Sequence, residues 1–311
     1  MPGSPDENRP LKIGSRGSQL ALWQARFVAE KLRASGAATE IEIIKTTGDH
    51  LQTASLVQAG GKGLFTKEIE EALLAKQIDI AVHSMKDLPS VIPDNLVIAA
   101  VPEREDPRDA IVGGRFDDLP QGGRVGTSSS RRAAQLRLMR PDLDIQPIRG
   151  NVDTRLRKLK DGFYDAIVVA AAGLRRLGLD HEIADLFSHD QMCPAPGQGA
   201  LAVETRANDL AREICAPLNH EQTAQAVRCE RTVVAELGGG CQLPLGVFAE
   251  SDGEMLHVIG IVISPDGSRF VKAESTGPRD YPEKLGEALA GGLLARGAQT
   301  ILNESTSSVQ P

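Results

Sequence analysis

Strand-like and helix-like segments alternate through the first half of the chain, and this alternation constrains the fold more than any other feature. Residues 11–15 (LKIGS) are typical of a strand, and residues 19–33 carry apolar side chains at helical spacing. A strand at 39–46, a helix at 64–76 and a buried strand at 78–84 follow. Strands that alternate with helices in this way predict a sheet with helices on both of its faces.

The same alternation begins again farther along the chain. Strands are expected at 124–128 and 144–148, and helices at 130–139 and 151–162. Residues 164–173 (YDAIVVAAAG) are nearly all apolar, which is typical of a strand in a sheet that is covered on both faces. Two successive blocks of this kind predict an α/β protein with two doubly wound domains.

The last third of the chain has a different pattern. A long helix is expected at 221–237, and the turn sequences SDGEM and SPDGS separate strand-like runs after it. A final helical stretch spans about 282–302 and is interrupted by Gly291 and Gly292. This pattern predicts a smaller C-terminal α+β domain.

The composition argues against several classes of protein. No run of about eighteen apolar residues occurs, so a membrane span is not expected. Residues 1–10 (MPGSPDENRP) lack the apolar core of a signal peptide, so we expect a disordered lead and a cytoplasmic protein. A formal net charge of −7 with only 3% aromatic residues argues against nucleic-acid binding.

Positive charge is nevertheless concentrated in one segment. Between Arg124 and Arg176, twelve Arg or Lys residues stand against five Asp, a net charge of +7 that favours an anionic ligand. Three loops that lead into helices, 14–19, 125–132 and 148–155, combine Gly, Ser or Thr with Arg. Such loops suit carboxylates or phosphates, although each alone is also typical of a helix cap beside a solvated charge. No nucleotide-binding glycine motif is present.

One of the four cysteines differs from the others. Cys215 and Cys229 lie in helical patterns and are expected to pack in cores, while Cys193 is a loop residue without an assigned role. No Cys-x-x-Cys pair occurs, so a zinc site is not expected. Cys241 lies in the loop ELGGGCQLPLG, where glycines let the backbone turn and leave space beside the sulfur.

A polar cluster, HSMKDLP (83–89), follows the buried strand that ends near residue 84. Asp87 is either a turn cap or an anion placed where positive charge develops during a reaction, with Lys86 beside it. His83 is either a base or a histidine that is simply hydrogen-bonded. The residues alone leave both choices open.

Nine motifs occur along the chain in this order: GSRGSQLALWQ, GGKGLFTKEIE, AVHSMKDLP, EREDPRDA, VGTSSSRRAAQL, IRGNVDTRLRKL, AAGLRRLGL, APGQGALAVE and GGGCQLPLG. Together they resemble the porphobilinogen deaminase (hydroxymethylbilane synthase) family from about residue 11 to about residue 275. Members of this family join four porphobilinogen molecules head to tail, release four ammonia molecules and free the linear product hydroxymethylbilane with water. They do so on a dipyrromethane cofactor, which a thioether holds to one loop cysteine.

The resemblance assigns a role to individual residues. Cys241 is implied to be the cofactor anchor, Asp87 the catalytic carboxylate, and Lys62 part of a mobile loop over the cleft. Every pyrrole carries an acetate and a propionate, which need cationic and hydroxyl partners. The other residues implied to bind the cofactor are Lys86, Thr127, Ser128, Ser129, Arg131, Arg132 and Arg155. Those implied to bind the substrate are Arg16, Ser18, Arg149, Arg176, Gln198 and Gly199.

The resemblance also implies a domain plan of two periplasmic-binding-protein-like domains around a cleft plus the C-terminal domain. Hinge strands are expected near 103–110 and 190–199. The expected domains are 11–102 with 198–219, then 106–195, and finally 221–311. We expect a monomer that uses no metal and no nucleotide and that passes its product to uroporphyrinogen-III synthase.

Two other interpretations remain at this point. The chain could be a two-lobed small-anion-binding protein without a covalent cofactor, or a thiol hydrolase in which His220 or His257 assists Cys241. Both predict a free Cys241 thiol, whereas the family resemblance predicts an occupied one. Three residues depart from those common in the family, and none of them touches Cys241 or Asp87: Ser130 stands for leucine, Pro196 for valine and Gly239 for glutamate.

Overall fold

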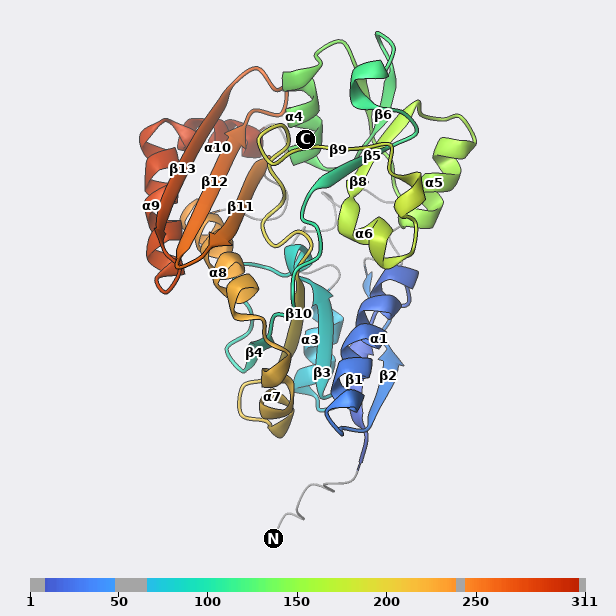
Figure 1. Ribbon diagram of the computed structural model, residues 1–311, viewed down its shortest axis with the longest axis vertical. Helices are drawn as coiled ribbons and strands as arrows, with labels where there is room; N and C mark the ends of the chain where they lie inside the picture. Colours follow the sequence, from blue (N-terminus) through green and yellow to red (C-terminus); the bar gives the residue numbers. More distant parts are fainter. Residues whose placement is uncertain (1–8, 48–65, 239–243, 308–311) are drawn as a thin grey trace.

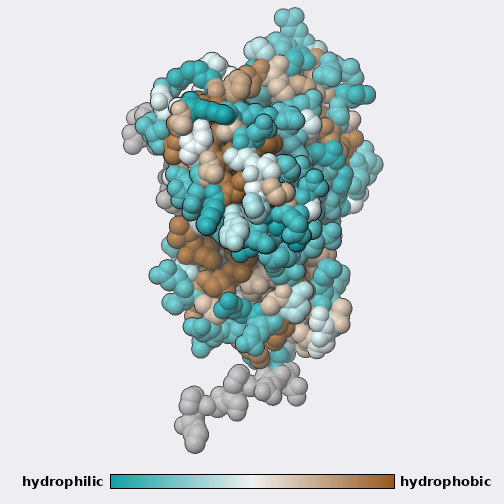
Figure 2. Space-filling view, turned by 60° about the vertical axis from the view of Figure 1, so that its left-hand side comes forward, coloured by the Kyte–Doolittle hydropathy of each residue, from teal (hydrophilic) through white to brown (hydrophobic). Residues whose placement is uncertain are grey.

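The computed structural model describes residues 9–47, 66–238 and 244–307, which form three sheets with their helices (Figure 1). Lys62, Gly239, Cys241 and most of the expected N-terminal lead lie outside the described residues. The two α/β units and the smaller α+β unit confirm the predicted fold class. The side of the molecule formed by the C-terminal unit is mostly hydrophilic (Figure 2).

The first sheet has the strand order β2-β1-β3-β10-β4. Its strands are β1 (Leu11–Ser15), β2 (Thr39–Ile43), β3 (Ile80–Ser84), β4 (Leu96–Ala100) and β10 (Leu201–Arg206). β1 is parallel to β2 and β3, whereas β10 is antiparallel to both of its neighbours. The helices are α1 (Gln19–Ala34), α3 (Lys67–Leu74) and α7 (Leu210–Cys215). Apolar residues of α1 and α7 pack on one face of this sheet and those of α3 on the other, so both faces are covered.

The second sheet has the order β7-β6-β8-β5-β9. Its strands are β5 (Asp109–Val112), β6 (Arg124–Gly126), β7 (Asp144–Gln146), β8 (Ala166–Ala170) and β9 (Asp185–Leu186). Its helices are α4 (Ser130–Met139), α5 (Val152–Lys160) and α6 (Ala171–Arg176). The expectation of one strand over 164–173 was wrong in its last residues, because α6 begins directly where β8 ends. Apolar content alone does not separate a buried strand from a buried helix, and alanine favours the helix.

The C-terminal sheet is antiparallel, with the order β11-β12-β13. Its strands are β11 (Leu245–Asp252), β12 (Met255–Ile263) and β13 (Phe270–Pro278), and its helices are α8 (Glu221–Glu236), α9 (Pro282–Ala295) and α10 (Ala298–Ser307). The expected interruption at Gly291 and Gly292 was wrong, since α9 continues through both. Buried Leu289 and Leu293, one turn apart, hold this part of α9 on the sheet. The break comes at Gly297, whose φ of +96° suits glycine.

Two chain segments cross between the α/β units and contact each other. The backbone N–H of Glu105 donates to the carbonyl of Gly199 (3.2 Å), and the Arg104 Nε donates to the carbonyl of Gln198 (2.8 Å). Gly199 has a φ of +86°, and a Cβ there would lie 2.2 Å from the Glu105 carbonyl oxygen. The second crossing leads into β10, which inserts between β3 and β4 of the first sheet.

Short 3-10 helices complete the fold. They are η1 (Met85–Asp87), η2 (Phe116–Asp118), η3 (Asp180–Glu182) and η4 (Ala216–Leu218). Of these, η1 directly follows β3 and therefore places its residues at the edge of the first sheet that faces the second unit. Among the helices of the described residues, none is both long and apolar enough to cross a membrane.

Candidate functional site

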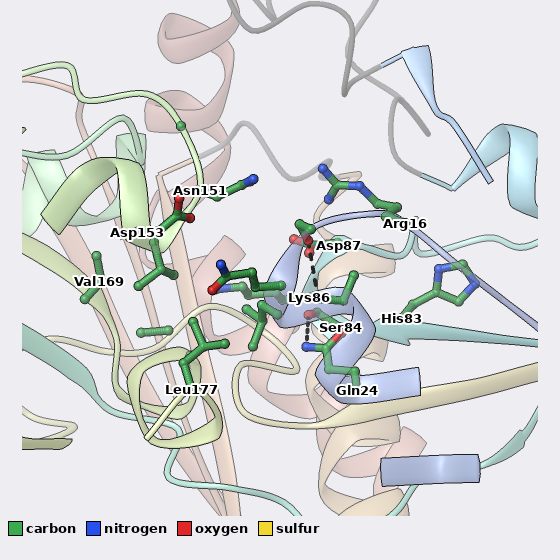
Figure 3. Close-up of a pocket in the computed structure, with 18 of the residues that line it drawn as sticks. Arg16, Gln24, His83, Ser84, Lys86, Asp87, Asn151, Asp153, Val169 and Leu177 are labelled. Atoms are coloured by element: carbon green, nitrogen blue, oxygen red, sulfur yellow. Dashed lines mark hydrogen bonds between the residues drawn. The ribbon is translucent and has the colours of Figure 1, made fainter. Parts of the chain in front are cut away.

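A cavity of about 280 Å³ lies between the two α/β units. The first unit contributes the loop before α1, the end of β3, η1 and the start of α3. The second contributes Arg132 of α4, the loop and first residues of α5, and residues of β8 and α6. Figure 3 shows Arg16 and Asp87 on one side of this cavity and Asn151 and Asp153 on the other. A ligand here would touch both units.

The first wall carries the exposed carboxylate of Asp87. Asp87 ends η1, so the short helix turns its side chain toward the cavity (Figure 3). Ser18 caps α1, and its hydroxyl accepts from the backbone N–H of Ala21 (3.3 Å). This cap ends the loop that carries Arg16, and it fixes the cavity-lining start of α1.

Lys86 lies half-buried at the base of the cavity. Burial and, to a smaller extent, the nearby positive charge of Arg132 lower the pKa of its ammonium group to about 8, against the opposing charge of Asp87. The Nζ donates to the Gln198 Oε1 at 3.4 Å. A cation whose charge is disfavoured in this way is a good partner for an incoming carboxylate.

A buried carboxylate, Asp109 of β5, holds the two arginines of α4. Its oxygens accept from the Arg131 Nη1 (2.7 Å), the Arg132 Nε (2.8 Å) and the Gln198 Nε2 (3.0 Å). Burial raises the pKa of Asp109, but the two guanidinium groups outweigh it and hold the pKa well below its usual range. Arg132 reaches the cavity, whereas Arg131 also donates to the Cys193 carbonyl (2.7 Å) and does not line it.

The loop before α4 is ordered by its own hydroxyl groups. The Ser129 side chain caps the helix by accepting from the Arg132 N–H (3.4 Å), and the Thr127 Oγ1 accepts from the Ser129 N–H (3.2 Å). The Ser128 hydroxyl donates to the Ile148 carbonyl (2.8 Å) and so links this loop to the one before α5. These residues position Arg132 without lining the cavity themselves.

Two further arginines have a lowered pKa because they are buried. Burial lowers the pKa of Arg176 to about 10, and burial together with the charge of Arg132 lowers the pKa of Arg155 to about 10. The Arg155 Nε donates to the Gly150 carbonyl (2.8 Å), and Arg155 lines the cavity. The Arg176 Nη2 donates to the Gly199 carbonyl (2.6 Å), and its guanidinium lies 5.6 Å from the Trp23 ring of α1. Arg176 therefore contacts the first unit as well as the second crossing segment.

The structure brings part of the predicted set together. The predicted residues that line the cavity are Arg16, Ser18, Lys86, Asp87, Arg132 and Arg155. Those that lie around it without lining it are Thr127, Ser128, Ser129, Arg131, Arg149, Arg176, Gln198 and Gly199. Lys62 and Cys241 lie outside the described residues.

Two structural carboxylates were not singled out from the sequence. Asp109 is one, and Glu230 of α8 is the other. Glu230 is fully buried and accepts from the Arg104 Nη1 (2.6 Å), the Gly197 N–H (2.6 Å) and the Ala249 N–H (2.8 Å). Glu230 thus connects the C-terminal unit to both crossing segments through hydrogen bonds. The motif EREDPRDA could have indicated the role of Asp109. This residue begins a buried strand, and a buried carboxylate needs a cationic partner.

The two histidines of the thiol-hydrolase interpretation, His220 and His257, do not line the cavity. His220 contacts Thr223 (2.8 Å), and His257 contacts Thr276 on the C-terminal sheet (2.8 Å). His83 is hydrogen-bonded, with its Nε2 lying 3.0 Å from the Glu204 Oε2. Among the described residues, no group of three or more His, Cys, Asp or Glu side chains could hold a metal ion.

Solved structures with a similar chain path have low sequence identity to this chain. A periplasmic substrate-binding protein of an ABC transporter from Coxiella burnetii is 13% identical, with a TM-score of 0.41 over 67% of this chain and 91% of that one. DctP7, an extracytoplasmic solute receptor from Bordetella pertussis, is 12% identical, with a TM-score of 0.40 over 74% and 83%. Scores this low carry no argument about function.

Sequence comparison is far more specific. The family model for the porphobilinogen deaminase dipyromethane cofactor binding domain matches residues 11–213, and the model for the porphobilinogen deaminase C-terminal domain matches residues 224–295. The porphobilinogen deaminase of Pelobacter propionicus is 50% identical over 301 residues, which cover 95% of this chain and 97% of that protein. That of Geobacter metallireducens is also 50% identical and covers 95% of both. The chain belongs to the porphobilinogen deaminase family.

Proposed function

We propose that the cavity between the two α/β units is where this chain joins four porphobilinogen molecules into hydroxymethylbilane, a step of tetrapyrrole biosynthesis. One observation supports this placement above the others. The cavity combines four cationic side chains, Arg16, Lys86, Arg132 and Arg155, with the exposed carboxylate of Asp87. The cations suit the acetate and propionate groups of the substrate, and the carboxylate suits a developing pyrrole cation.

The same donor set fits the dipyrromethane cofactor of the family. Four carboxylates on two pyrrole rings need several cations, and the lowered pKa values of Lys86 and Arg155 reflect buried positive charge that an anionic ligand would stabilise. We assign the attachment to Cys241 and the carboxylate contacts to Lys86, Arg132 and Arg155. The hydroxyl groups of residues 127–129 and the guanidinium of Arg131 complete this binding region. The cofactor supplies the free α-carbon from which the product grows.

Asp87 is the proposed catalytic residue. Loss of ammonia from porphobilinogen leaves positive charge on the incoming pyrrole, and bond formation then moves that charge to the ring that attacks. A carboxylate between the two rings, near their N–H groups, stabilises both positions.

The remaining predicted residues receive positioning and substrate-binding roles. The residues proposed to bind the substrate are Arg16, Ser18, Arg149, Arg176, Gln198 and Gly199. The hydrogen bonds of Arg176 and Gln198 to the crossing segments support an additional positioning role for these two residues. The domains we propose are 11–102 with 198–219, 106–195 and 221–311, and Lys62 belongs to a loop over the cavity.

We further propose that the protein works in the cytoplasm as a monomer and delivers its product to uroporphyrinogen-III synthase. Three cysteines, Cys193, Cys215 and Cys229, are free and buried, which suits a reducing compartment. Delivery to a second enzyme follows from the chemistry of hydroxymethylbilane, a reactive linear tetrapyrrole that closes into a ring.

An Asp87→Asn variant tests the proposed function. We expect it to carry the dipyrromethane mass, because the anchor and cations are intact, and to form hydroxymethylbilane very slowly. The measurement is product formation from porphobilinogen, with intact mass as the check on cofactor loading. Near-normal turnover by Asp87→Asn would refute the role of this carboxylate. An Asp153→Asn variant, which changes a carboxylate on the opposite wall, is the matched control.

A further inference from the structure

Three buried titratable side chains lie behind the wall of the cavity, between α3 and the first sheet. They are Glu70 of α3, His83 of β3 and Glu204 of β10, and none is more than 9% exposed. His83 lines the cavity, together with Ile69 and Thr66 from the first residues of α3 and the segment before it. The mechanism given above uses none of the three buried groups.

The contacts within this cluster leave hydrogen-bonding capacity unused. The His83 Nε2 lies 3.0 Å from the Glu204 Oε2. The Oε1 atoms of Glu70 and Glu204 are buried and have no hydrogen-bond partner among the residues that the structure describes. Burial raises the pKa of Glu70, and the charge of Glu204 raises it further. The raised pKa favours the protonated form of the Glu70 carboxyl group.

The family reaction produces a proton that must leave the reacting atoms. The aminomethyl group of porphobilinogen reacts as its ammonium form, so that ammonia departs with the electron pair of the C–N bond and leaves a cationic methylene on the incoming pyrrole. The α-carbon of the terminal ring forms the new C–C bond, and its C–H electrons return to the ring as the proton leaves. That proton finally converts ammonia to ammonium, so atoms and charge balance. If Asp87 kept the proton, it would lose the charge that stabilises the next cation.

We propose that His83, backed by Glu204 and Glu70, accepts the proton released at the α-carbon in each condensation and passes it on to ammonia or solvent. This proposal rests on the proposed function of the cavity. Figure 3 shows the His83 ring at the edge of the cavity, on the side of Asp87 but turned away from it. The proton therefore reaches His83 through a water molecule of the cavity as the C–H bond breaks, and Glu204 and Glu70 are positioning residues that hold the imidazole.

Register explains why these side chains meet. In the ladder between β3 and β10, His83 lies opposite Ala202, and Glu204 lies opposite Ala81, two residues along the same face. Alanine at both facing positions leaves room for the imidazole and the carboxylate to approach diagonally. Because β10 follows the second crossing segment, the cluster forms only when the chain has returned to the first sheet.

A substrate isotope effect separates this role from a purely structural one. Porphobilinogen carrying deuterium at its free α-carbon is supplied to the parent protein and to His83→Asn. The second and later condensations, in which a labelled ring attacks, are followed by rapid quench and intact mass. We expect His83→Asn to condense about 100-fold more slowly, with a larger isotope effect than the parent and an unchanged KM, because proton removal becomes limiting. Glu204→Gln should likewise lower the condensation rate and raise the isotope effect. His257→Asn, a histidine bonded to a threonine on another sheet, should match the parent.

Three outcomes would overturn the proposal. The first is parent-like condensation by His83→Asn, and the second is a slower variant whose isotope effect equals that of the parent. The third applies if His83→Asn and Glu204→Gln do not fold. In that case Glu70→Gln is measured instead, and a parent-like rate and isotope effect for this variant would overturn the proposal. Failure of the proposed function is seen separately, since the parent would then form no hydroxymethylbilane from unlabelled porphobilinogen.

Discussion

Replacement of Asp109 by asparagine should destabilise the second α/β unit strongly. The carboxylate is 0% exposed, and its partners Arg131 and Arg132 have side chains that are only 5% and 7% exposed. Asparagine keeps one oxygen acceptor but removes the charge, so two guanidinium groups stay buried without a counter-ion. Breaking a buried pair in this way costs about 3–5 kcal/mol, and the retained acceptor places Asp109→Asn near the lower end.

Hydrogen exchange of the amides in β5, β6 and β8 measures this loss within the unit concerned. The matched control is Asp165→Asn, which alters an arginine–aspartate pair of the same unit whose side chains are 43% and 37% exposed. Surface pairs contribute about 0–1 kcal/mol, so the control should change exchange little. A loss for Asp109→Asn that is no larger than for Asp165→Asn would refute the reasoning.

The pH dependence of stability tests the role of Asp109 in a second way. The folded-state pKa of Asp109 lies below its unfolded value, because the two arginines outweigh burial. The stabilising contribution is therefore fully present above about pH 4, the unfolded range of aspartate, and declines as the pH falls toward the folded pKa. The parent should lose stability on acidification more steeply than Asp109→Asn does.

Three further predictions concern other parts of the molecule. Burial and Arg132 lower the pKa of Lys86 to about 8, so Lys86 loses its charge and KM for porphobilinogen should rise as the pH passes from 7 to 9. Lys86→Arg should flatten this rise, and equal pH profiles of KM for the two proteins would contradict the prediction. Gly199→Ala should lower the free energy of unfolding by about 1–3 kcal/mol more than Gly162→Ala, as measured by urea unfolding. Both glycines have a positive φ, but of the two only Gly199 has backbone atoms within 4 Å of the added Cβ. Cys193, Cys215 and Cys229, whose thiol pKa burial raises to about 12, should resist iodoacetamide in the native protein; mass-detected alkylation of any of the three would disprove this.

The alternating pattern of the sequence predicted most of the regular elements. α4 has the predicted bounds, and β1 matches residue for residue. Local periodicity was enough because each element buries one face on its own sheet. It could not show that β10, far along the chain, inserts between β3 and β4, since that pairing depends on the crossing segments and leaves no local pattern.

The site was predictable to a different extent. Motifs located the loops that carry Arg16, Asp87 and Arg132, because residues after strand ends meet at one edge of a sheet. They did not reveal that Arg131 turns inward to Asp109, since two adjacent arginines on a helix look alike in sequence but face different surroundings. Likewise the Glu70, His83 and Glu204 cluster unites three separate elements and has no sequence signature.

The most direct test of the central claim is the intact mass of the purified protein under denaturing conditions, beside a Cys241→Ser variant. We predict that the parent exceeds its polypeptide mass by one dipyrromethane unit and that the variant does not. A bare mass for the parent that stays unchanged after incubation with porphobilinogen would contradict it, as would an equal excess on the variant.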